Sequence, residues 1–336
     1  MHRAQTSGKE SGVKAMYEQQ MMIKVCKLYY QQQLTKTEIA DKLHISRFKV
    51  ARLIDKAKKE GIIRIQIVSP AKDLGYLEER LENELGLKAA LVVEGVENDY
   101  QANLWELGKG TAKFLLETLQ EGDILGISAG TTVTEVIKAL PEKTSFSKLY
   151  IVQVAGGLWQ LNTIDGMKIL NMLSEKLNSE ISMFIVPAFV QSPQIKEVLL
   201  EDPGVRKTVA LFDKITIALV GIGAWYPELK SNLNIAGGFP QEDIQWLQER
   251  GVVADVFNHM VNMQGEIIQG PVIDRMITID LDKTKKINYV IAVAGGEYKS
   301  HAILAAVRSG LVHALVTDRC TAVRILQLLE QEENPI

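Results

Sequence analysis

The sequence predicts an α/β protein in two parts: an N-terminal helix-turn-helix unit, followed by a domain built on a mostly parallel sheet. Three observations support this fold class. Residues 34–61 carry two helical patterns separated by a short break, and the rest of the chain alternates apolar runs with helical segments. The third observation is that positive charge is concentrated ahead of the first apolar run.

Composition places the chain among globular proteins. It has 336 residues, 46% of them hydrophobic, which is long enough for two domains. Cys26 and Cys320 are the only cysteines, too few for a disulfide framework, which favours a reducing compartment. The start, MHRAQTSGKESGVKA, lacks the apolar core of a signal peptide, and no apolar run approaches the roughly 20 residues that span a bilayer. We therefore expect a cytoplasmic protein with no membrane contact, no metal and no cofactor.

The net charge of −3 hides an uneven distribution. Residues 1–64 contain 14 Lys and Arg against 6 Asp and Glu, a net charge of +8, whereas the remainder contains 24 against 35, a net charge of −11. A basic segment ahead of an acidic body is typical of a nucleic-acid-binding module, although a charged, solvated surface would give the same count.

Two short helices are predicted within residues 34–61. Their apolar positions recur at helical spacing: Ile39, Ala40 and Leu43 in the first, and Val50, Leu53, Ile54 and Ala57 in the second. Ser46 is a favourable N-cap for the second helix, and Gly61 suits a left-handed residue at its end.

The spacing between the helices fits a helix-turn-helix motif. Such a motif needs a small residue in the first helix, a turn residue four positions later and a β-branched core residue six positions beyond that. Ala40, His44 and Val50 stand at these spacings. The turn residue is most often Gly, but His is among the residues enriched at positive φ. The pattern favours DNA binding over a purely structural helical hairpin.

The polar face of the second helix supplies the candidate DNA contacts. Phe48 and Arg52 point away from the apolar face near the helix start, so we expect Arg52 to pair with guanine and Phe48 to contact a thymine methyl. Neighbouring cations are better placed for phosphates, which position a protein without specifying sequence. The predicted DNA-binding set is Ser46, Arg47, Phe48, Lys49, Arg52, Lys56 and Lys59. Each lysine fits a solvated face equally well.

The flanking segments complete the domain assignment. A helix before the motif is predicted from Met22, Ile23, Cys26 and Tyr30, and residues 62–68 alternate like a strand that would form a wing. The stripe Leu74, Leu77, Leu81 and Leu85 predicts a helix that either joins two copies of the chain or packs on its own domain. We place the helix-turn-helix domain at 1–68, a linker helix at 69–86 and the α/β domain at 87–336.

Seven apolar runs of strand character follow Leu87. They are AALVVEG, DILGIS, LYIVQVAGG, ISMFIVPA, KITIALVGIG, NYVIAVAGG and HALVTD. Continuous apolar strands alternating with helices predict a parallel sheet covered on both faces. Ligands of such sheets lie beyond the carboxyl ends of the strands, where this sequence places the small-residue segments GISAGTT, AGG, GIG and AGGEYK.

The segment GISAGTT supports two interpretations of Ser128. As G-x-S-x-G it matches the turn that exposes a nucleophilic serine in α/β-hydrolases. As a turn rich in glycine and hydroxyl groups that opens a helix, it can bind phosphate. A hydrolase needs a later acid and a histidine at strand ends, and none of His259, His301 and His313 stands at a suitable position. The sequence therefore favours phosphate binding over nucleophilic catalysis, with a tight turn that holds no ligand as a further possibility.

Two charged residues extend the candidate site. Lys299 follows a strand and a Gly-Gly pair at the start of a helix, where a cation gains nothing from the helix dipole. A bound anion would explain it, and a surface lysine is the alternative. Asp255 is a candidate acceptor for a sugar hydroxyl, although capping a local turn is the commoner role of such a residue.

Taken together, these motifs resemble the SorC/DeoR-type sugar-binding transcriptional regulators over almost the entire chain from about Met16. The resemblance rests on residues 34–67, on GISAGTT, on GIG, on residues 251–265 and on AGGEYKSHAI. It implies a winged helix-turn-helix domain and a C-terminal domain with the fold of phosphosugar isomerases. It also implies that Ser128, Gly130, Thr131 and Thr132 hold a phosphate, that Lys299 adds a charge to it, and that Gly221, Gly223 and Asp255 line the sugar.

Some positions depart from the family pattern. Phe48 stands where the family usually has Pro, and residues 251–265 have Ala254 for Gly, His259 for the common Arg and Asn262 for Asp. These departures bear on which effector is bound and leave the architecture unaffected.

The resemblance implies a bacterial transcriptional regulator, most often a repressor, of a carbohydrate-utilisation operon. It would bind double-stranded operator DNA as a homodimer or homotetramer, respond to a phosphorylated sugar and catalyse no reaction. The sequence also fits two alternatives. One is an enzyme related to phosphosugar isomerases, with Asp255 or Glu297 as general base, and the other is a serine hydrolase that uses Ser128.

Overall fold

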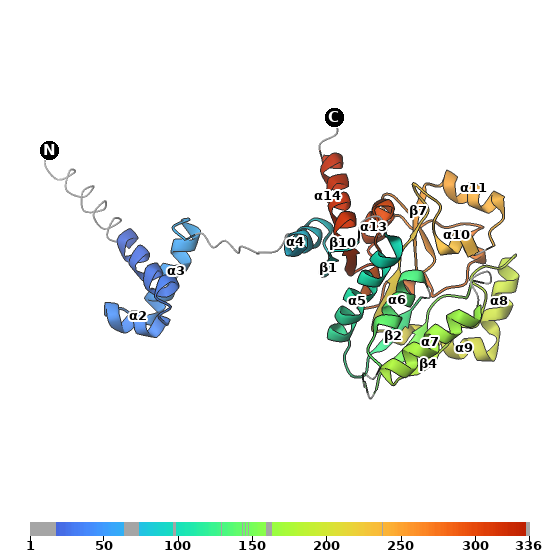
Figure 1. The fold of residues 1–336 in the computed structure, drawn as a ribbon, viewed down its shortest axis with the longest axis horizontal. Helices are drawn as coiled ribbons and strands as arrows, with labels where there is room; N and C mark the ends of the chain where they lie inside the picture. Colours follow the sequence, from blue (N-terminus) through green and yellow to red (C-terminus); the bar gives the residue numbers. More distant parts are fainter. Residues whose placement is uncertain are drawn as a thin grey trace. The chain divides into compact units, whose positions relative to one another are not determined.

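A computed structural model of the chain describes residues 18–63, 74–96, 99–128, 130–142, 144, 146, 148–158, 163–236 and 238–333. The chain divides into two compact units, Met1–Pro70 and Ala71–Ile336 (Figure 1). The predicted wing, residues 62–68, falls mostly outside the described residues, because only its first two residues are described and neither is in a strand.

The first unit is helical. Residues 18–26 are helical and continue as η1 (Lys27–Gln31), followed by α2 (Lys36–Leu43) and α3 (Arg47–Lys59). The apolar residues predicted for α2 and α3 are buried, apart from Leu43, which packs against this core half-buried. The predicted helix before the motif is present, with Met22 and Cys26 buried; Ile23 and Tyr30 are each 38% exposed, whereas Val25 and Leu28 are buried.

Local backbone chemistry fixes the turn between α2 and α3. Thr35 caps α2 in a capping box with Glu38, and the Ser46 hydroxyl accepts a hydrogen bond of 3.2 Å from the Lys49 N–H at the start of α3. His44 adopts the left-handed conformation with φ of 51°, as its place in the motif predicts, and Gly61 does so beyond the end of α3 with φ of 70°.

The second unit is built on a seven-stranded sheet in which every neighbouring pair of strands is parallel. Its strands, in spatial order, are β1 (Ala89–Val93), β10 (Ala314–Asp318), β9 (Tyr289–Val293), β5 (Ile217–Gly221), β2 (Ile124–Ile127), β3 (Tyr150–Gln153) and β4 (Glu180–Ser182). Each predicted apolar run contributes one of these strands, and ISMFIVPA contributes only its first two residues. The prediction of an α/β fold with a mostly parallel sheet is confirmed.

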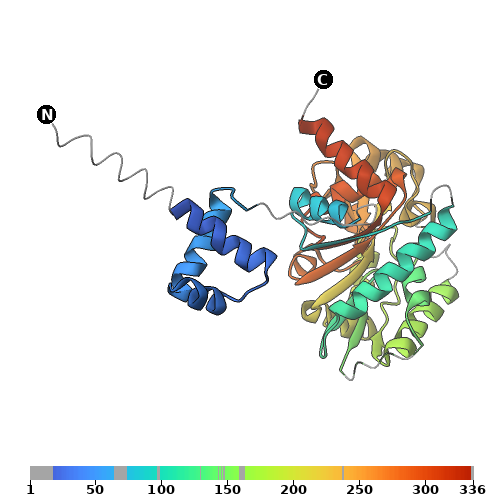
Figure 2. The same cartoon turned by 60° about the vertical axis from the view of Figure 1, so that its left-hand side comes forward.

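Helices cover both faces of this sheet (Figures 1 and 2). One face packs against α5 (Tyr100–Thr118), α6 (Thr131–Ala139) and α7 (Thr163–Leu177). The other face packs against α4 (Leu74–Leu85), α13 (Ser300–Arg308) and α14 (Arg319–Glu333). Because both faces are buried, the strands are apolar at successive positions instead of alternating.

A second, antiparallel sheet was not predicted. It consists of β6 (Gly223–Ala224), β7 (Val252–Val256) and β8 (His259–Asn262). The hairpin between β7 and β8 turns at Phe257 and Asn258, both at positive φ, 55° and 62°. Two successive residues at positive φ are the mark of a type I′ turn, but its usual Asn-Gly or Asp-Gly sequence is absent here. The sequence therefore carries no signal for this hairpin, in which His259 is the first residue of β8.

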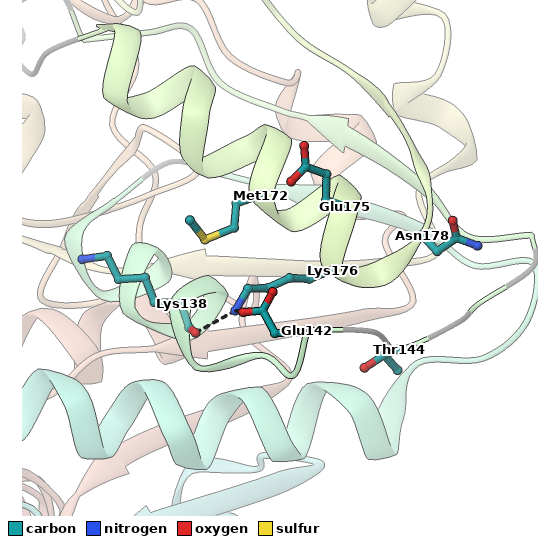
Figure 3. A pocket seen from close by; sticks show the side chains of 7 residues that line it. All are labelled: Lys138, Glu142, Thr144, Met172, Glu175, Lys176 and Asn178. Atoms are coloured by element: carbon teal, nitrogen blue, oxygen red, sulfur yellow. Dashed lines mark hydrogen bonds and ion pairs between the residues drawn. The ribbon is translucent and has the colours of Figure 1, made fainter.

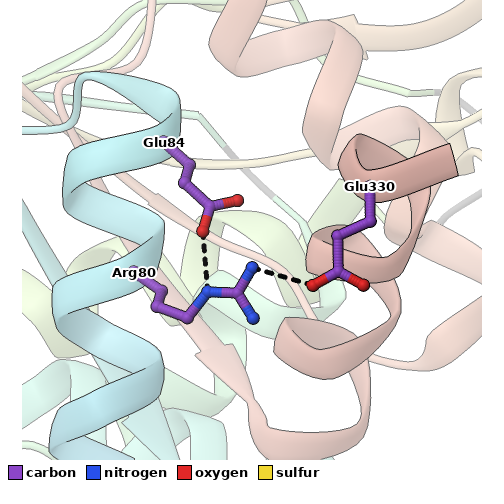
Figure 4. Close-up of polar contacts among 3 residues, drawn as sticks. All are labelled: Arg80, Glu84 and Glu330. Carbon is purple, nitrogen blue, oxygen red and sulfur yellow. Dashed lines mark hydrogen bonds and ion pairs between the residues drawn. The ribbon is translucent and has the colours of Figure 1, made fainter. Parts of the chain in front are cut away.

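The leucine stripe of α4 packs on its own unit, as one of the two interpretations held. Glu82 and Glu78 also accept 2.9 Å hydrogen bonds from the Ala90 and Val92 N–H groups of the edge strand β1. Arg80 links α4 to α14 through Glu330 at 3.0 Å (Figure 4). The carboxylates satisfy N–H groups that an edge strand would otherwise leave open.

Shorter elements connect these layers. They are α8 (Pro193–Glu201), α9 (Pro203–Val209), η2 (Phe212–Lys214), α10 (Asn232–Ala236), α11 (Gln241–Glu249), η3 (Ile273–Arg275), α12 (Leu281–Thr284) and η4 (Glu297–Lys299). Among the described residues, no helix combines the length and apolar character needed to cross a membrane.

Candidate functional site

The candidate effector site lies at one edge of the large sheet. β9, β5 and β2 are neighbours, and being parallel they present their carboxyl ends at the same edge. Ser128 follows β2, Gly221 ends β5, and η4 with Lys299 follows β9 shortly after its end. The topology therefore places these predicted site residues on adjacent loops, where parallel sheets bind ligands.

The loop between β2 and α6 offers hydroxyl groups and free backbone N–H groups. Ser128 is 8% exposed and Thr132 is 6% exposed, and neither hydroxyl has a hydrogen-bond partner among the described residues. Gly130 is the N-cap of α6 and supplies no side-chain cap. Within the described residues, no side chain caps the first N–H groups of α6, and an anion is an acceptor that a helix start favours. Ala129 lies outside the described residues.

Three predicted glycines fall into two classes. An added Cβ at Gly130 or Gly221 would meet no described atom within 4 Å, and neither glycine has positive φ. Neither packing nor backbone conformation among the described residues therefore requires glycine at these two positions. Gly223 differs, because a Cβ there would lie 2.7 Å from Asp255 Cγ. Its absence of a side chain makes room for the Asp255 carboxylate.

Asp255 is buried in β7 and is held by two donors. Its Oδ1 accepts a 2.7 Å hydrogen bond from Trp225 Nε1 and a second hydrogen bond from the Ser231 hydroxyl. Burial raises the pKa of the Asp255 carboxyl, and the hydrogen bonds from Ser231 and Trp225 and the nearby charge of Lys299 act against that rise. The residue does not cap a local turn, which was the alternative to a ligand role.

Lys299 points inward and not along the surface. Its Nζ donates a 2.9 Å hydrogen bond to the backbone carbonyl of Ile222, in the short segment between β5 and β6. Burial lowers the pKa of the Lys299 amine to about 8, and the charge of Asp255 partly opposes that shift. The structure thus brings Lys299, Asp255 and the Gly221–Gly223 segment into one cluster, in which the ammonium retains further donors for a ligand.

Two residues of this cluster were missed by the sequence analysis. Ser231 bonds Asp255, and its neighbour Asn232 donates from Nδ2 to Thr131 Oγ1 at 2.9 Å. Consecutive side chains thus link Asp255 to the start of α6. No motif marks the segment KSNLNIA, and these contacts span long sequence separations, so nothing local in the sequence indicated them.

Asp318 was also missed, and it organises the neighbouring loops. It ends β10 and accepts hydrogen bonds from Gly296 N at 2.6 Å, Asn103 Nδ2 at 3.1 Å, and the N–H and hydroxyl of Thr321 at 2.9 and 2.8 Å. An added Cβ at Gly295 would also collide with its carboxylate. The Gly-Gly pair before Lys299 is therefore explained in part by Asp318.

The histidines do not complete a hydrolase. His259 Nε2 lies 3.3 Å from Thr284 Oγ1, and burial lowers the pKa of its imidazole to about 4. His313 precedes β10 and accepts a 3.1 Å hydrogen bond from the Val290 N–H, whereas the His301 ring packs edge-on against Tyr226. Within the described part of the chain, none of the three hydrogen-bonds Ser128, and no group of three His, Cys, Asp or Glu residues is placed to hold a metal.

A cavity of about 770 Å³ lies at the opposite end of α6 from the candidate site (Figure 3). Lys176 projects into it, and its Nζ donates to the backbone carbonyls of Lys138 at 2.9 Å and Leu140 at 2.6 Å. These bonds satisfy carbonyls at the C-terminal end of α6, so Lys176 acts as a helix cap. None of the predicted site residues lines this cavity.

The candidate DNA-binding face lies on α3, opposite its buried side. Phe48 is 88% exposed, and Arg47, Lys49, Arg52 and Lys59 are also exposed. Lys56 is half-buried, and its Nζ pairs with Glu18 at 2.9 Å and Glu60 at 3.7 Å. The face thus presents an aromatic ring among cations, with Lys56 partly neutralised.

Comparison with known proteins defines the class. Residues 69–327, more than half of the chain, match the family described as "Putative sugar-binding domain", and the chain therefore belongs to that family. The resemblance to SorC/DeoR-type sugar-binding transcriptional regulators is confirmed by the relatives below.

Individual relatives cover nearly the whole chain. The sorbitol operon regulator of Klebsiella pneumoniae is 26% identical over 311 residues, which cover 91% of this chain and 98% of the relative. The transcriptional regulator LsrR of Enterobacter sp. (strain 638) is 29% identical over 317 residues, covering 94% and 95%. The crystal structure of full-length SorC from Klebsiella pneumoniae matches with a TM-score of 0.70 and 26% identity, covering 92% of this chain and 98% of that one.

Proposed function

We propose that the chain is a DNA-binding transcriptional regulator whose affinity for operator DNA is controlled by a phosphorylated sugar. The first unit is the DNA-binding domain, a helix-turn-helix with α3 as the recognition helix. The second is the effector domain, related to the phosphosugar isomerases in fold but without catalytic activity. The regulated genes are those of a carbohydrate-utilisation operon, and repression is the expected direction of control.

One observation carries the DNA-binding assignment: α3 buries its apolar side completely and still exposes Phe48 at 88% among cations. An exposed aromatic ring gains nothing within the unit, whereas a ring in the major groove gains contact with a thymine methyl. Arg52 then pairs with guanine. Phosphates are bound by Arg47, Lys49 and Lys59, and also by the N-terminus of α3, which Ser46 caps. Lys56 contributes less because of its pairing with Glu18.

The effector binds the loops at the carboxyl edge of the sheet. Ser128, Gly130, Thr131 and Thr132 hold the phosphate, whose negative charge suits the start of α6 and the Lys299 ammonium. Gly221 allows the ligand to approach β5, and Asp255, which Gly223 accommodates, accepts a sugar hydroxyl. The buried hydroxyls of Ser128 and Thr132 support this assignment, because they are ready to bond a phosphate.

Control of DNA binding requires that the effector bind one arrangement of the protein more tightly than another, because only a difference in affinity shifts an equilibrium. A homodimer or homotetramer is the expected assembly, since paired recognition helices read half-sites about one helical turn apart.

Two experiments test these assignments separately. Selection of duplexes from a random library should enrich a two-fold symmetric sequence, and enrichment of no sequence would contradict the DNA-binding assignment. A thermal-shift screen against sugar phosphates should find at least one that stabilises the chain. A ligand at 100 times its Kd adds about 2.7 kcal/mol to the free energy of unfolding. Turnover of a sugar phosphate would instead indicate an enzyme.

A further inference from the structure

Asn232 makes a contact whose direction has a consequence for the phosphate site. Its Nδ2 donates a 2.9 Å hydrogen bond to Thr131 Oγ1, across 101 positions of sequence. Thr131 is the first residue of α6 and is exposed, whereas Asn232 begins α10 and is half-buried. The bond therefore reaches from a separate segment to a hydroxyl at the predicted phosphate position.

The chemistry of a hydroxyl makes the direction of this bond decisive. A threonine hydroxyl has one hydrogen to donate and two lone pairs that accept. Because the Asn232 amide N–H occupies one lone pair, the Thr131 hydrogen is directed elsewhere. An ionised phosphate oxygen can only accept a hydrogen bond. A Thr131 hydroxyl that accepts from Asn232 is thus already set to donate to phosphate.

The neighbours of Asn232 hold it in place. Ser231 is 1% exposed, and its N–H donates a 2.8 Å hydrogen bond to the Ala224 carbonyl while its hydroxyl bonds Asp255. Leu233 is 2% exposed, and its N–H donates a 3.2 Å hydrogen bond to the Ser231 hydroxyl. Asn232 therefore stands between two buried anchors, which limits the freedom of its side chain before any ligand binds.

We propose that Asn232 is a positioning residue of the effector site, which fixes the Thr131 hydroxyl as a hydrogen-bond donor to the phosphate group; this inference rests on the proposed function. Ser231 contributes to this positioning, because its hydroxyl forms hydrogen bonds with both Asp255 and the backbone N–H of Leu233, next to Asn232. The segment from Ser231 to Leu233 thereby couples the phosphate end of the site to the sugar-hydroxyl end.

Calorimetric titration with inorganic phosphate tests this role on the full chain. Asn232→Ala frees the Thr131 hydroxyl to rotate and should weaken phosphate binding about 3- to 10-fold, the net effect of one neutral hydrogen bond. Asn232→Asp should weaken it further, by about tenfold beyond the alanine variant, because a carboxylate accepts the Thr131 hydrogen and repels phosphate. Asn234→Ala is the matched control on α10, since its amide donates to the Leu229 carbonyl at 3.4 Å and not to the site.

A double-variant comparison separates positioning from a structural role. Thr131→Ala should weaken phosphate binding, and adding Asn232→Ala to it should change affinity by less than about twofold, because the hydroxyl to be oriented is gone. Equal phosphate affinity in Asn232→Ala and the unsubstituted chain would overturn the inference, as would additive losses or an Asn232→Asp variant that binds like the unsubstituted chain. No phosphate binding by the unsubstituted chain would overturn the proposed phosphate site itself.

Discussion

Replacing Gly221 or Gly223 with alanine should affect different properties of the protein, although the two positions are only two residues apart. A Cβ at Gly221 meets no described atom within 4 Å, and the residue does not have positive φ, so the fold should accept alanine. A Cβ at Gly223 would lie 2.7 Å from Asp255 Cγ, so the carboxylate would have to move. The first change should therefore affect the ligand, and the second should affect the fold.

The magnitudes follow from these contacts. Gly221→Ala should leave the free energy of unfolding unchanged or raise it by about 0.4–1 kcal/mol, because alanine restricts the unfolded chain. Gly223→Ala should lower it by about 1–3 kcal/mol through overpacking, and by about a further 1.5–3 kcal/mol if a hydrogen bond to the buried carboxylate is lost. A methyl group in the path of the ligand at Gly221 should weaken effector binding by tenfold or more, about 1.4 kcal/mol.

Urea denaturation measures the stability of each variant, and calorimetric titration with a stabilising sugar phosphate measures affinity. Gly130→Ala serves as a second open-space variant, for which we expect the same pattern as Gly221→Ala. Two results would contradict these predictions: a Gly221→Ala variant that binds the effector as tightly as the unsubstituted chain, or a Gly223→Ala variant that is fully stable. Unchanged effector binding by Gly221→Ala would mean that the ligand does not bind at this edge of the sheet. Full stability of Gly223→Ala would mean that the Asp255 side chain is not tightly confined.

The remaining predictions concern DNA and pH. Operator affinity should fall roughly 10³-fold between 50 and 200 mM salt if six or more phosphates are contacted. Binding that does not depend on salt would contradict this prediction. A chain truncated to begin at Ala71 should not bind DNA. Arg52→Ala should cost about 1–3 kcal/mol on the operator and relax one position, whereas Lys59→Ala should weaken all duplexes alike; equal losses on operator and random DNA for Arg52→Ala would refute the assignment. Effector affinity should fall as pH rises through about 8, where Lys299 loses its charge, and Lys299→Met should abolish that fall. Because the unfolded chain keeps this proton up to the ordinary pKa of 10.5, Lys299 should also make the free energy of unfolding rise between pH 8 and 10.5, which urea denaturation would detect.

Much of the fold could be predicted because its signals are local. The buried positions Val50 and Leu53 of α3 follow from helical periodicity, and the left-handed His44 follows from its place in the motif. The strands of the large sheet are continuous apolar runs, which periodicity and composition reveal. The β7–β8 hairpin escaped prediction because Phe257–Asn258 is an uncommon type I′ sequence, so the turn carried no recognisable signal.

The candidate site could be predicted only in part. Glycine and hydroxyl residues at strand ends predicted the loop of Ser128 as a candidate phosphate site. This prediction was possible because the residues of that loop are consecutive in the sequence. Ser231, Asn232 and Asp318 act through side-chain bonds that span long sequence separations or several loops, and no spacing rule relates them to their partners. Such contacts depend on the order of strands in the sheet, which a single sequence does not reveal.

The proposed function requires one chain to couple phosphate binding at the β2–α6 loop to DNA binding at α3. Fluorescence anisotropy of the chain on its selected duplex, titrated with sugar phosphates, tests this most directly. We expect at least one sugar phosphate to change the Kd for DNA by about 5- to 150-fold. Thr132→Ala or Ser128→Ala should require about 10- to 150-fold more effector and leave DNA binding without effector nearly unchanged. DNA binding that no sugar phosphate altered would contradict the proposed function, as would a Ser128→Ala variant that kept the full response and lost an esterase activity.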